Sequence, residues 1–251
     1  MIYELKIALR TIRNEGVGPL CGKMFDYFRD IASASSFRYP KDGTVEEVVD
    51  FSMNTRLIGI GQNPQEFLDM CRIVKKFSPR TVLEIGTARG GTLAAWCALS
   101  HPQAEIASVD MPGGIHGGGY SAWRGKFYQK EFPRPSQKLT LIRADSHAES
   151  TLAQVRQLFP NGIDFLFIDG DHTYDGLKKD FDMYTPLVKP DGIIAIHDIC
   201  RDIAEIQVHV KPFWDEIKGK YSSKELIENS NRIPLGIGVL FKKAELVPSL
   251  T

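Results

Sequence analysis

The sequence predicts an α/β fold in which a doubly wound, mostly parallel sheet of seven strands ends in an antiparallel hairpin. Through the middle of the chain, apolar segments of strand length alternate with helical patterns. These segments are apolar throughout, as expected for strands that helices cover on both faces. Near the end of the chain, the strand-like runs 221–229 and 236–243 have no helix between them, which predicts a hairpin.

Composition and charge exclude several classes of protein. Lys plus Arg and Asp plus Glu both number 31, so there is no electrostatic case for a nucleic-acid partner. The four cysteines form no C-x-x-C pair, which argues against a zinc site or disulfide framework and fits a reducing cytoplasm. The charged N-terminal segment is unlike a signal peptide, and no apolar run approaches the ~18 residues of a membrane span. We therefore expect a cytoplasmic protein without a membrane partner.

The first part of the chain, residues 1–58, is expected to be a helical arm that precedes the main domain at 59–251. Within 2–13, one helical face carries Ile2, Leu5, Leu9 and Ile12. This face would pack on the core or on a second copy of the chain rather than on a membrane surface, because the opposite face mixes both charge signs; a homodimer is compatible with this arrangement. The irregular stretch 14–43 either covers a site or joins two copies, and the sequence does not decide between them.

A helix is predicted to begin at Asn63 and to end before Ser78-Pro79. Asn63 is a good N-cap, Pro64 suits the first helical position, and Glu66 completes the spacing of a capping box. The preceding residues 59–62 are rich in glycine and could lie over a ligand.

Strand and helix patterns then alternate. Five strands are expected, at 81–85, 105–110, 139–145, 164–169 and 192–197. Helices are expected at 91–99, within 146–159, where Ser146 and Glu149 have capping-box spacing, and after Thr173, where Leu177, Phe181 and Tyr184 share a face. A short helix beginning at Pro212 precedes the hairpin. On the helix after Thr173, Asp180 and Asp182 with Lys178 and Lys179 suggest a solvated face.

The turn after the first strand indicates a nucleoside site. A nicotinamide site requires G-x-G-x-x-G, but here Ala88 replaces the middle glycine between Gly86 and Gly90. Glu84 would repel a pyrophosphate and suits a cationic ligand. Asp110, which ends the next strand, can accept hydrogen bonds from both ribose hydroxyls. Together these residues point to a nucleoside with no phosphate and a positive centre, and S-adenosylmethionine has this character.

The third predicted strand ends at Asp145 and Ser146. Asp145 could accept a hydrogen bond from an exocyclic adenine amine, with Ser146 beside it. The alternative is that one of the two caps the following helix, and the two roles are compatible.

Acidic residues and imidazoles end the fourth and fifth strands. Asp169, Asp171 and His172 follow the fourth, and His197 and Asp198 end the fifth. Neighbouring parallel strands bring these ends to one rim, where ligands bind in open α/β sheets. Carboxylates with an imidazole suit a divalent ion such as Mg²⁺. A single histidine at a strand end is more often structural, but the group of residues favours a site.

Three stretches resemble a known family. L-E-I-G-T-A-R-G-G-T, I-D-G-D-H-T-Y-D-G-L-K-K-D and V-K-P-D-G-I-I-A-I-H-D resemble class I S-adenosylmethionine-dependent methyltransferases. They are most similar to the small-molecule O-methyltransferase branch called methyltransferase family 24, with its cephalosporin-hydroxylase-like relatives. The resemblance spans about 59–243 and implies a Rossmann-like sheet.

The resemblance implies roles at matching positions. Asp110 would hold the ribose, and Asp145 and Ser146 would flank the adenine. His172 would take the proton of the acceptor, at a position where metal-dependent relatives carry lysine. The rim of the cofactor pocket would include Glu84, Gly86, Thr87, Gly90 and Asp169, and the ion would be held by Asp169, His197 and Asp198. His197 departs from the acidic residue that is usual in those relatives.

We therefore expect a methyltransferase that transfers a methyl group from S-adenosylmethionine to a hydroxyl of a small molecule, assisted by Mg²⁺ or another divalent cation. The glycine- and aromatic-rich stretch 111–132 would be a lid over the acceptor, or an insertion packed on the sheet edge. A second candidate is a Rossmann-type nucleotide-dependent oxidoreductase, which the missing glycine and the terminal hairpin disfavour. A third is a cofactor-binding partner protein without catalysis.

Overall fold

A seven-stranded sheet forms the centre of the computed structural model, which describes residues 30–112 and 119–243. The strand order is β3-β2-β1-β4-β5-β9-β8, and only the pairings of β9 with β5 and β8 are antiparallel. This confirms the predicted fold class. The strands are β1 (Thr81–Ile85), β2 (Glu105–Val109), β3 (Lys138–Ile142), β4 (Ile163–Ile168), β5 (Val188–His197), β8 (Ser222–Leu226) and β9 (Ile237–Phe241).

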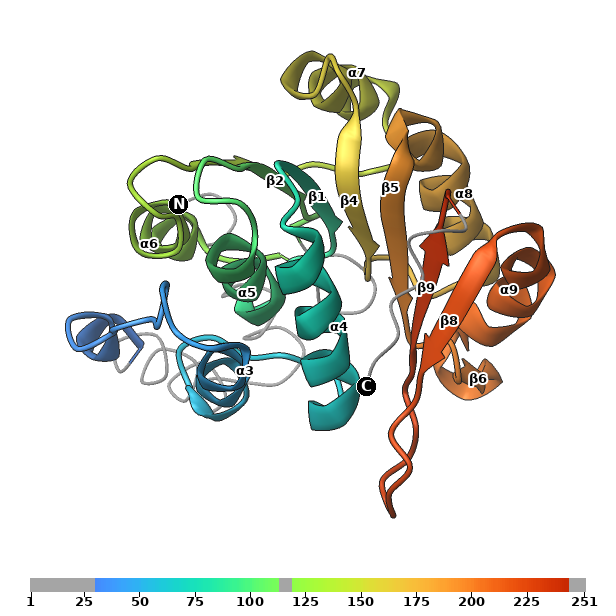
Figure 1. Ribbon diagram of the computed structural model, residues 1–251, viewed down its shortest axis with the longest axis horizontal. Helices are drawn as coiled ribbons and strands as arrows, with labels where there is room; N and C mark the ends of the chain where they lie inside the picture. Colours follow the sequence, from blue (N-terminus) through green and yellow to red (C-terminus); the bar gives the residue numbers. More distant parts are fainter. Residues whose placement is uncertain (1–29, 113–118, 244–251) are drawn as a thin grey trace, which may run out of the picture.

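Helices cover both faces of the sheet (Figure 1). One face meets α3 (Val45–Asn54), α4 (Pro64–Phe77), α5 (Gly91–Leu99) and α6 (Ala122–Glu131), and the other meets α7 (Glu149–Leu158), α8 (Tyr174–Tyr184) and α9 (Val210–Ile217). Alternate residues of a strand point to opposite faces. Val82 of β1 therefore packs in the first of these clusters and Leu83 in the second.

The helix α4 has the predicted bounds but not the predicted cap. It begins at Pro64 and ends at Phe77, followed by Ser78 in the left-handed conformation. The side chain of Asn63 does not accept a hydrogen bond from the backbone; its amide instead donates to the carboxylate of Glu66 at 3.3 Å. Glu66 is buried and is used by another segment of the chain, described below.

The predicted capping box at Ser146 is also absent, whereas the predicted cap of α8 is present. The helix α7 begins after Ala148, with no side-chain cap. At α8, the hydroxyl of Thr173 accepts a hydrogen bond from the backbone N–H of Gly176 at 3.1 Å. The acidic turn after β4 therefore leads directly into a capped helix.

The terminal hairpin is fixed by α9. A side chain at Gly238 of β9 would lie 2.5 Å from the Trp214 ring, so glycine allows the ring to rest on the strand. The loop before α9 contains a small hairpin of β6 (Asp202–Ile203) and β7 (Val208–His209). Within the described ranges, short 3₁₀ helices lie at Thr185–Leu187, Ala204–Ile206 and Lys218–Lys220.

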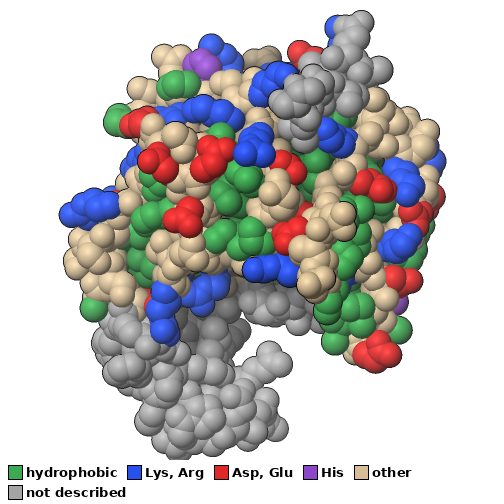
Figure 2. Space-filling model, turned by 60° about the horizontal axis from the view of Figure 1, so that its bottom comes forward, with side chains coloured by type: hydrophobic (Ala, Val, Ile, Leu, Met, Phe, Trp, Pro, Cys, Tyr) green, Lys and Arg blue, Asp and Glu red, His purple; other side chains and the backbone are tan. Residues whose placement is uncertain are grey.

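The described part of the expected N-terminal arm packs on the main core. Phe37, Tyr39, Val48 and Leu57 are buried in the same cluster as α4 and α5. The predicted helix at 2–13 lies outside the described residues. On the face drawn in Figure 2, basic and acidic side chains of the described residues intermingle and neither sign dominates. None of the described helices is long and apolar enough to span a membrane.

Candidate functional site

A cavity of about 390 Å³ lies across the carboxyl ends of the parallel strands. This is where the sequence predicted a site, and pockets of this size hold small molecules and cofactors. Of the predicted residues, its lining includes Gly86, Asp110, Asp145, Ser146, Asp169, His172, His197 and Asp198. Further residues that line the cavity include Gly61, Met111, His147, Gly170, Asp171, Arg201 and Leu235.

Gly86 lets two strand ends meet in the floor of this cavity. Its φ is +91°, and a side chain there would lie 2.0 Å from the carbonyl oxygen of Asp169. The backbone N–H of Asp169 donates to Ile85 at 2.8 Å, and that of Gly86 donates to Val109 at 2.9 Å. Only glycine fits this position, because both the φ angle and the close approach exclude a Cβ atom.

Asp110 fastens the glycine turn to the end of β2. One carboxylate oxygen accepts hydrogen bonds from the backbone N–H groups of Ala88 at 2.9 Å and of Thr87 at 3.3 Å. Burial raises the pKa of Asp110 to about 6, although these hydrogen bonds act in the opposite direction. The same side chain lines the cavity.

Three of the predicted cofactor residues lie outside the lining and support the turn instead. Glu84 is fully buried and accepts hydrogen bonds from Thr92 at 2.6 Å and Trp96 at 3.0 Å. Burial raises its pKa to about 8, so much of this carboxyl carries a proton at neutral pH. The other two are Gly90, where a side chain would meet the Tyr128 ring at 2.8 Å, and Thr87, whose hydroxyl bonds Ser108.

The loop after the edge strand β3 presents Asp145, Ser146 and His147 to the cavity. Asp145 accepts a hydrogen bond from the backbone N–H of His147 at 2.8 Å, so it caps the loop while lining the cavity. Tyr184 of α8 donates to the carbonyl of Ser146 at 2.7 Å. The loop is therefore held against α8.

A buried ion pair gives this loop a second attachment. The Nε2 atom of His147 lies 3.3 Å from a carboxylate oxygen of Asp180, which is fully buried. The carboxylate of Asp180 beside the ring raises the pKa of His147. The prediction that Asp180 belongs to a solvated helix face is wrong: Asp180 lies behind the acidic turn, whereas Asp182 pairs with Lys178 on the surface.

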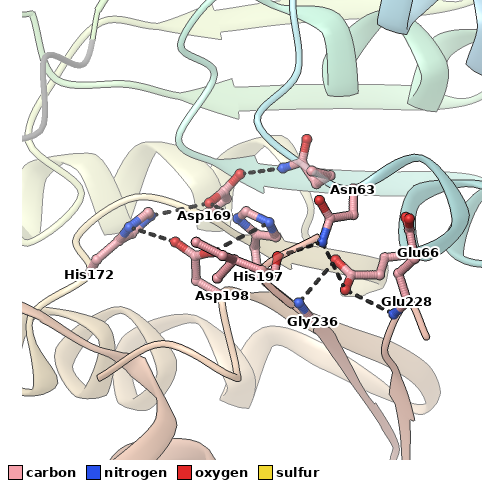
Figure 3. Close-up of polar contacts among 10 residues, drawn as sticks. Asn63, Glu66, Asp169, His172, His197, Asp198, Glu228 and Gly236 are labelled. Carbon is pink, nitrogen blue, oxygen red and sulfur yellow. Dashed lines mark hydrogen bonds and ion pairs between the residues drawn. The ribbon is translucent and has the colours of Figure 1, made fainter. Parts of the chain in front are cut away.

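The fourth and fifth strands bring two carboxylates and two imidazoles together (Figure 3). The same oxygen of Asp169 contacts His197 Nδ1 at 2.9 Å and His172 Nε2 at 3.2 Å. On its other side, His172 Nδ1 lies 3.2 Å from Asp198. The second oxygen of Asp169 accepts from the side-chain amide of Gln62 at 2.8 Å. The predicted residues of this rim are therefore in mutual contact, and Gln62 joins them.

These contacts decide the charges in the network. Burial alone would lower the pKa of His172, but hydrogen bonds to Asp169 and Asp198 outweigh it and raise the pKa to about 10. The pKa of His197 is raised as well, against its burial, by the charge of Asp169. The pKa of Asp169 is lowered despite burial, because both imidazoles lie beside it. At neutral pH, His172 is therefore an imidazolium between two carboxylates.

The three predicted metal ligands do not converge on one ion in this arrangement. Both oxygens of Asp169 face protein donors, and His197 turns its Nδ1 to Asp169 rather than to a shared centre. Within 30–112 and 119–243, no three His, Cys, Asp or Glu side chains are placed to hold a metal ion. The donor set therefore fits an imidazole–carboxylate network better than a divalent cation.

Asp198 has a strained backbone. Its φ is +63°, a left-handed conformation that is uncommon for residues other than glycine and for which Asn and Asp are favoured. The strain turns the chain at the end of β5 and presents the carboxylate to His172. Strained backbone of this kind occurs often at functional sites.

The far wall of the cavity is held by Glu66. Its two carboxylate oxygens accept hydrogen bonds from the backbone N–H groups of Glu228 and Gly236, both at 3.0 Å (Figure 3). Gly236 accepts in turn from Ile199, beside the cavity residues Asp198 and Leu235. The loop between β8 and β9 is thereby fastened to α4.

The predicted lid is largely a packed insertion. Tyr120, Phe127, Tyr128 and Phe132 are buried in the core beside α5, which is the alternative given above. Arg124 binds Asp30 and the carbonyl of Leu57, so it does not face the cavity. Residues 113–118, including His116, lie outside the described part.

Gln62, His147, Asp180 and Arg201 of the site carry no motif that would have marked them. The first three contact partners far away in the sequence, such as Gln62 with Asp169. The one usable signal was the glycine-rich approach before Asn63, which was expected to lie over a ligand.

Most of the residues that line the cavity lie in a region of the chain that matches a known protein family. A family model described as a methyltransferase domain, that of family 24, matches residues 83–199. Uncharacterized protein y4gI of Sinorhizobium fredii is 25% identical over 185 residues, which cover 71% of this chain and 19% of that protein. The chain therefore spans about a fifth of the length of this relative.

Solved structures share the fold. The O-methyltransferase from Bacillus cereus, solved in complex with SAH, has a TM-score of 0.57 and 18% identity, covering 84% of this chain and 96% of that chain. The O-methyltransferase TomG from Streptomyces achromogenes, which is involved in tomaymycin synthesis, was solved in complex with SAM. It has a TM-score of 0.54 and 13% identity, covering 84% and 94%.

Proposed function

Residues 83–199 form a methyltransferase domain of the S-adenosylmethionine-dependent class, and we propose that the protein transfers a methyl group from this cofactor to a hydroxyl group of a small molecule. The observation that carries the proposal is the cavity that runs from the glycine turn and Asp110 to the imidazole–carboxylate network. The end of the cavity at the glycine turn suits a nucleoside, and the imidazole–carboxylate network at the other end can accept a proton.

The lining of the cavity supports the choice of cofactor. Five aspartates line it, namely Asp110, Asp145, Asp169, Asp171 and Asp198. Such a lining favours a cationic nucleoside and disfavours a pyrophosphate. Asp110 would hold the ribose and the Asp145–Ser146 loop the adenine, beside the backbone of Gly86. When bound there, S-adenosylmethionine supplies the methyl group on its sulfonium centre.

His172 is the proposed base. It lines the cavity with both ring nitrogens beside carboxylates, Asp169 on one side and Asp198 on the other. These contacts fix the orientation of the ring. They also keep the ring protonated at rest, so it must release one proton before it can accept another from the acceptor hydroxyl. The protein's remaining contribution is to position the acceptor and exclude water.

A divalent cation enters no step of this proposal. The expected ligands Asp169, His197 and Asp198 are paired with each other, with His172 and with Gln62, and they do not surround one point. Asp169 and Asp198 act here by orienting His172.

Isothermal titration calorimetry tests the cofactor directly. We expect S-adenosylmethionine to bind and NAD not to bind. Asp110→Ala should weaken the cofactor about tenfold or more, since it removes the ribose contact and frees the Thr87 and Ala88 amides of the turn. The matched control Asp182→Ala removes a surface carboxylate of α8 and should bind as the wild type does. Binding of NAD in place of S-adenosylmethionine would overturn the proposal and favour the oxidoreductase.

The non-catalytic alternative, a cofactor-binding partner protein, is separated by turnover. The strained backbone of Asp198 and the burial of the ionisable network support catalysis, because both are costly features for a protein that only binds. Cofactor binding with no methyl transfer to any hydroxyl compound would favour this alternative.

A further inference from the structure

Arg201 is held at the edge of the cavity by its backbone. Its N–H donates to the carbonyl of Asp198 at 2.8 Å, and its carbonyl accepts from Lys211 at 2.9 Å. The adjoining hairpin is attached to the site as well, because the N–H of His209 donates to the carbonyl of His172 at 2.7 Å. A side chain on such a rigid segment is presented in a defined place.

The guanidinium of Arg201 is not used by the fold. Its Nε atom is buried without a hydrogen-bond partner, and among the described residues its side chain forms no ion pair. An unpaired donor of this kind costs free energy unless a ligand satisfies it. Among the described residues that line the cavity, Arg201 is the only lysine or arginine. The carboxylates nearest to it in the chain, Asp198 and Asp202, contact His172 and His209 instead.

Two further unpaired atoms lie on the same wall. His197 Nε2 and the Oδ1 oxygen of Asp198 are buried without hydrogen-bond partners and lie 3.7 Å from each other. Both residues are buried and line the cavity. Asp198 Oδ1 can accept a hydrogen bond from a hydroxyl group, and a ligand that reached this wall would meet a hydroxyl-binding pair and a guanidinium together.

We propose that the acceptor is a hydroxyl compound that also carries an anionic group, a carboxylate or a phosphate monoester, which Arg201 binds while the hydroxyl lies at Asp198, whose carboxylate also contacts the proposed base His172. This inference rests on the proposed function and names its substrate class. The planar fork of arginine matches both anions. The other ionisable side chains among the described lining residues are carboxylates and imidazoles. None of them would bind an anion as strongly as the guanidinium of Arg201.

The test uses the full chain saturated with S-adenosylhomocysteine. By calorimetry, dissociation constants are measured for 4-hydroxybenzoate, 3,4-dihydroxybenzoate and lactate, each beside its neutral amide, and for 4-hydroxybenzyl phosphate beside 4-hydroxybenzyl alcohol. We expect at least one acid to bind about tenfold or more tightly than its neutral counterpart. Arg201→Gln should remove this preference, and Arg201→Lys should keep part of it, since lysine retains the charge but not the fork. The carboxylate and phosphate arms tell the two anions apart.

Three results would overturn the inference. One is the absence of any preference for an acid, including no binding at all. Another is a preference that survives in Arg201→Gln. The third is an equal loss of S-adenosylhomocysteine affinity in Arg201→Gln, which would place the guanidinium on the cofactor's own carboxylate. Arg156→Gln, which removes an exposed arginine of α7, is the matched control and should behave as the wild type. If S-adenosylhomocysteine itself does not bind to the wild type, the proposed function fails instead.

Discussion

His172 lies between Asp169 and Asp198 and is the residue on which the proposed chemistry depends. From the sequence it is an imidazole placed where relatives carry lysine, with an ordinary pKa. In the structure the two carboxylates raise its pKa to about 10, which makes it more like that lysine than an ordinary histidine. Sequence position alone does not reveal this, because Asp198 comes from another strand.

The pH dependence of methyl transfer follows from this shift. Only unprotonated His172 can accept a proton, and its fraction rises about tenfold per pH unit below the pKa. We expect the rate of the chemical step to rise between about pH 7 and pH 9, and to level near pH 10.

His172→Gln should lower this rate roughly 100-fold or more and abolish the rise with pH, with cofactor affinity unchanged. Single-turnover kinetics against pH make the measurement. A wild-type rate that is flat across this range, or a His172→Gln variant as fast as wild type, would remove His172 from the role of base.

The sequence predicted best those elements whose two ends are marked by proline, glycine or another boundary residue. The helix α4 lies between Pro64 and the Ser78-Pro79 stop, and its predicted bounds are confirmed. The strand β1 and the helix α5 also match, since the glycine turn separates them. The caps were predicted less well: Asn63 and Ser146 have suitable neighbours in the sequence, but after folding Glu66 accepts from the backbone of Glu228 and Gly236, and α7 begins only after Ala148.

Misplaced side chains have a common physical cause. Asp180 sits among charged residues of α8, so its local sequence indicates a solvated face, but the loop with His147 covers it. The aromatic residues of 111–132 fit a lid by composition, whereas α6 turns Phe127 and Tyr128 into the core. In each case the decision is made by a contact between segments far apart in the chain.

The glycine turn joins β1 to the acidic turn after β4, and this junction can be tested by one methyl group. Gly86→Ala introduces a Cβ atom 2.0 Å from the Asp169 carbonyl at a φ of +91°. We expect the free energy of unfolding in urea to fall by about 3 kcal/mol or more. Gly219→Ala is the control, since a side chain there meets nothing within 4 Å, and it should stay within about 0.5 kcal/mol of wild type. Equal stability of the two variants would mean that the close approach is not a constraint.

At the scale of the whole molecule, the sheet order places the strand-end residues that line the cavity at one rim. Because β4 lies between β1 and β5, the nucleoside end of the cavity and the imidazole–carboxylate network share the turn at Asp169. The terminal hairpin, anchored through Glu66, closes the same rim from the far side. The doubly wound sheet and its terminal hairpin followed from the sequence pattern and the family resemblance. The pairing of the network did not, and it is the basis of our proposal that Asp169, His197 and Asp198 position an imidazole.

We propose that S-adenosylmethionine lies along this rim and that the imidazole–carboxylate network orients His172 with no metal ion bound between its residues. The most direct test is a crystal structure of the complex with S-adenosylhomocysteine grown in the presence of Mn²⁺, with anomalous diffraction recorded for the metal. We expect adenine at Asp145 and Ser146, ribose at Asp110, and no anomalous peak between Asp169, His197 and Asp198. A manganese ion bound by these three residues, or a nucleoside bound outside this cavity, would contradict it.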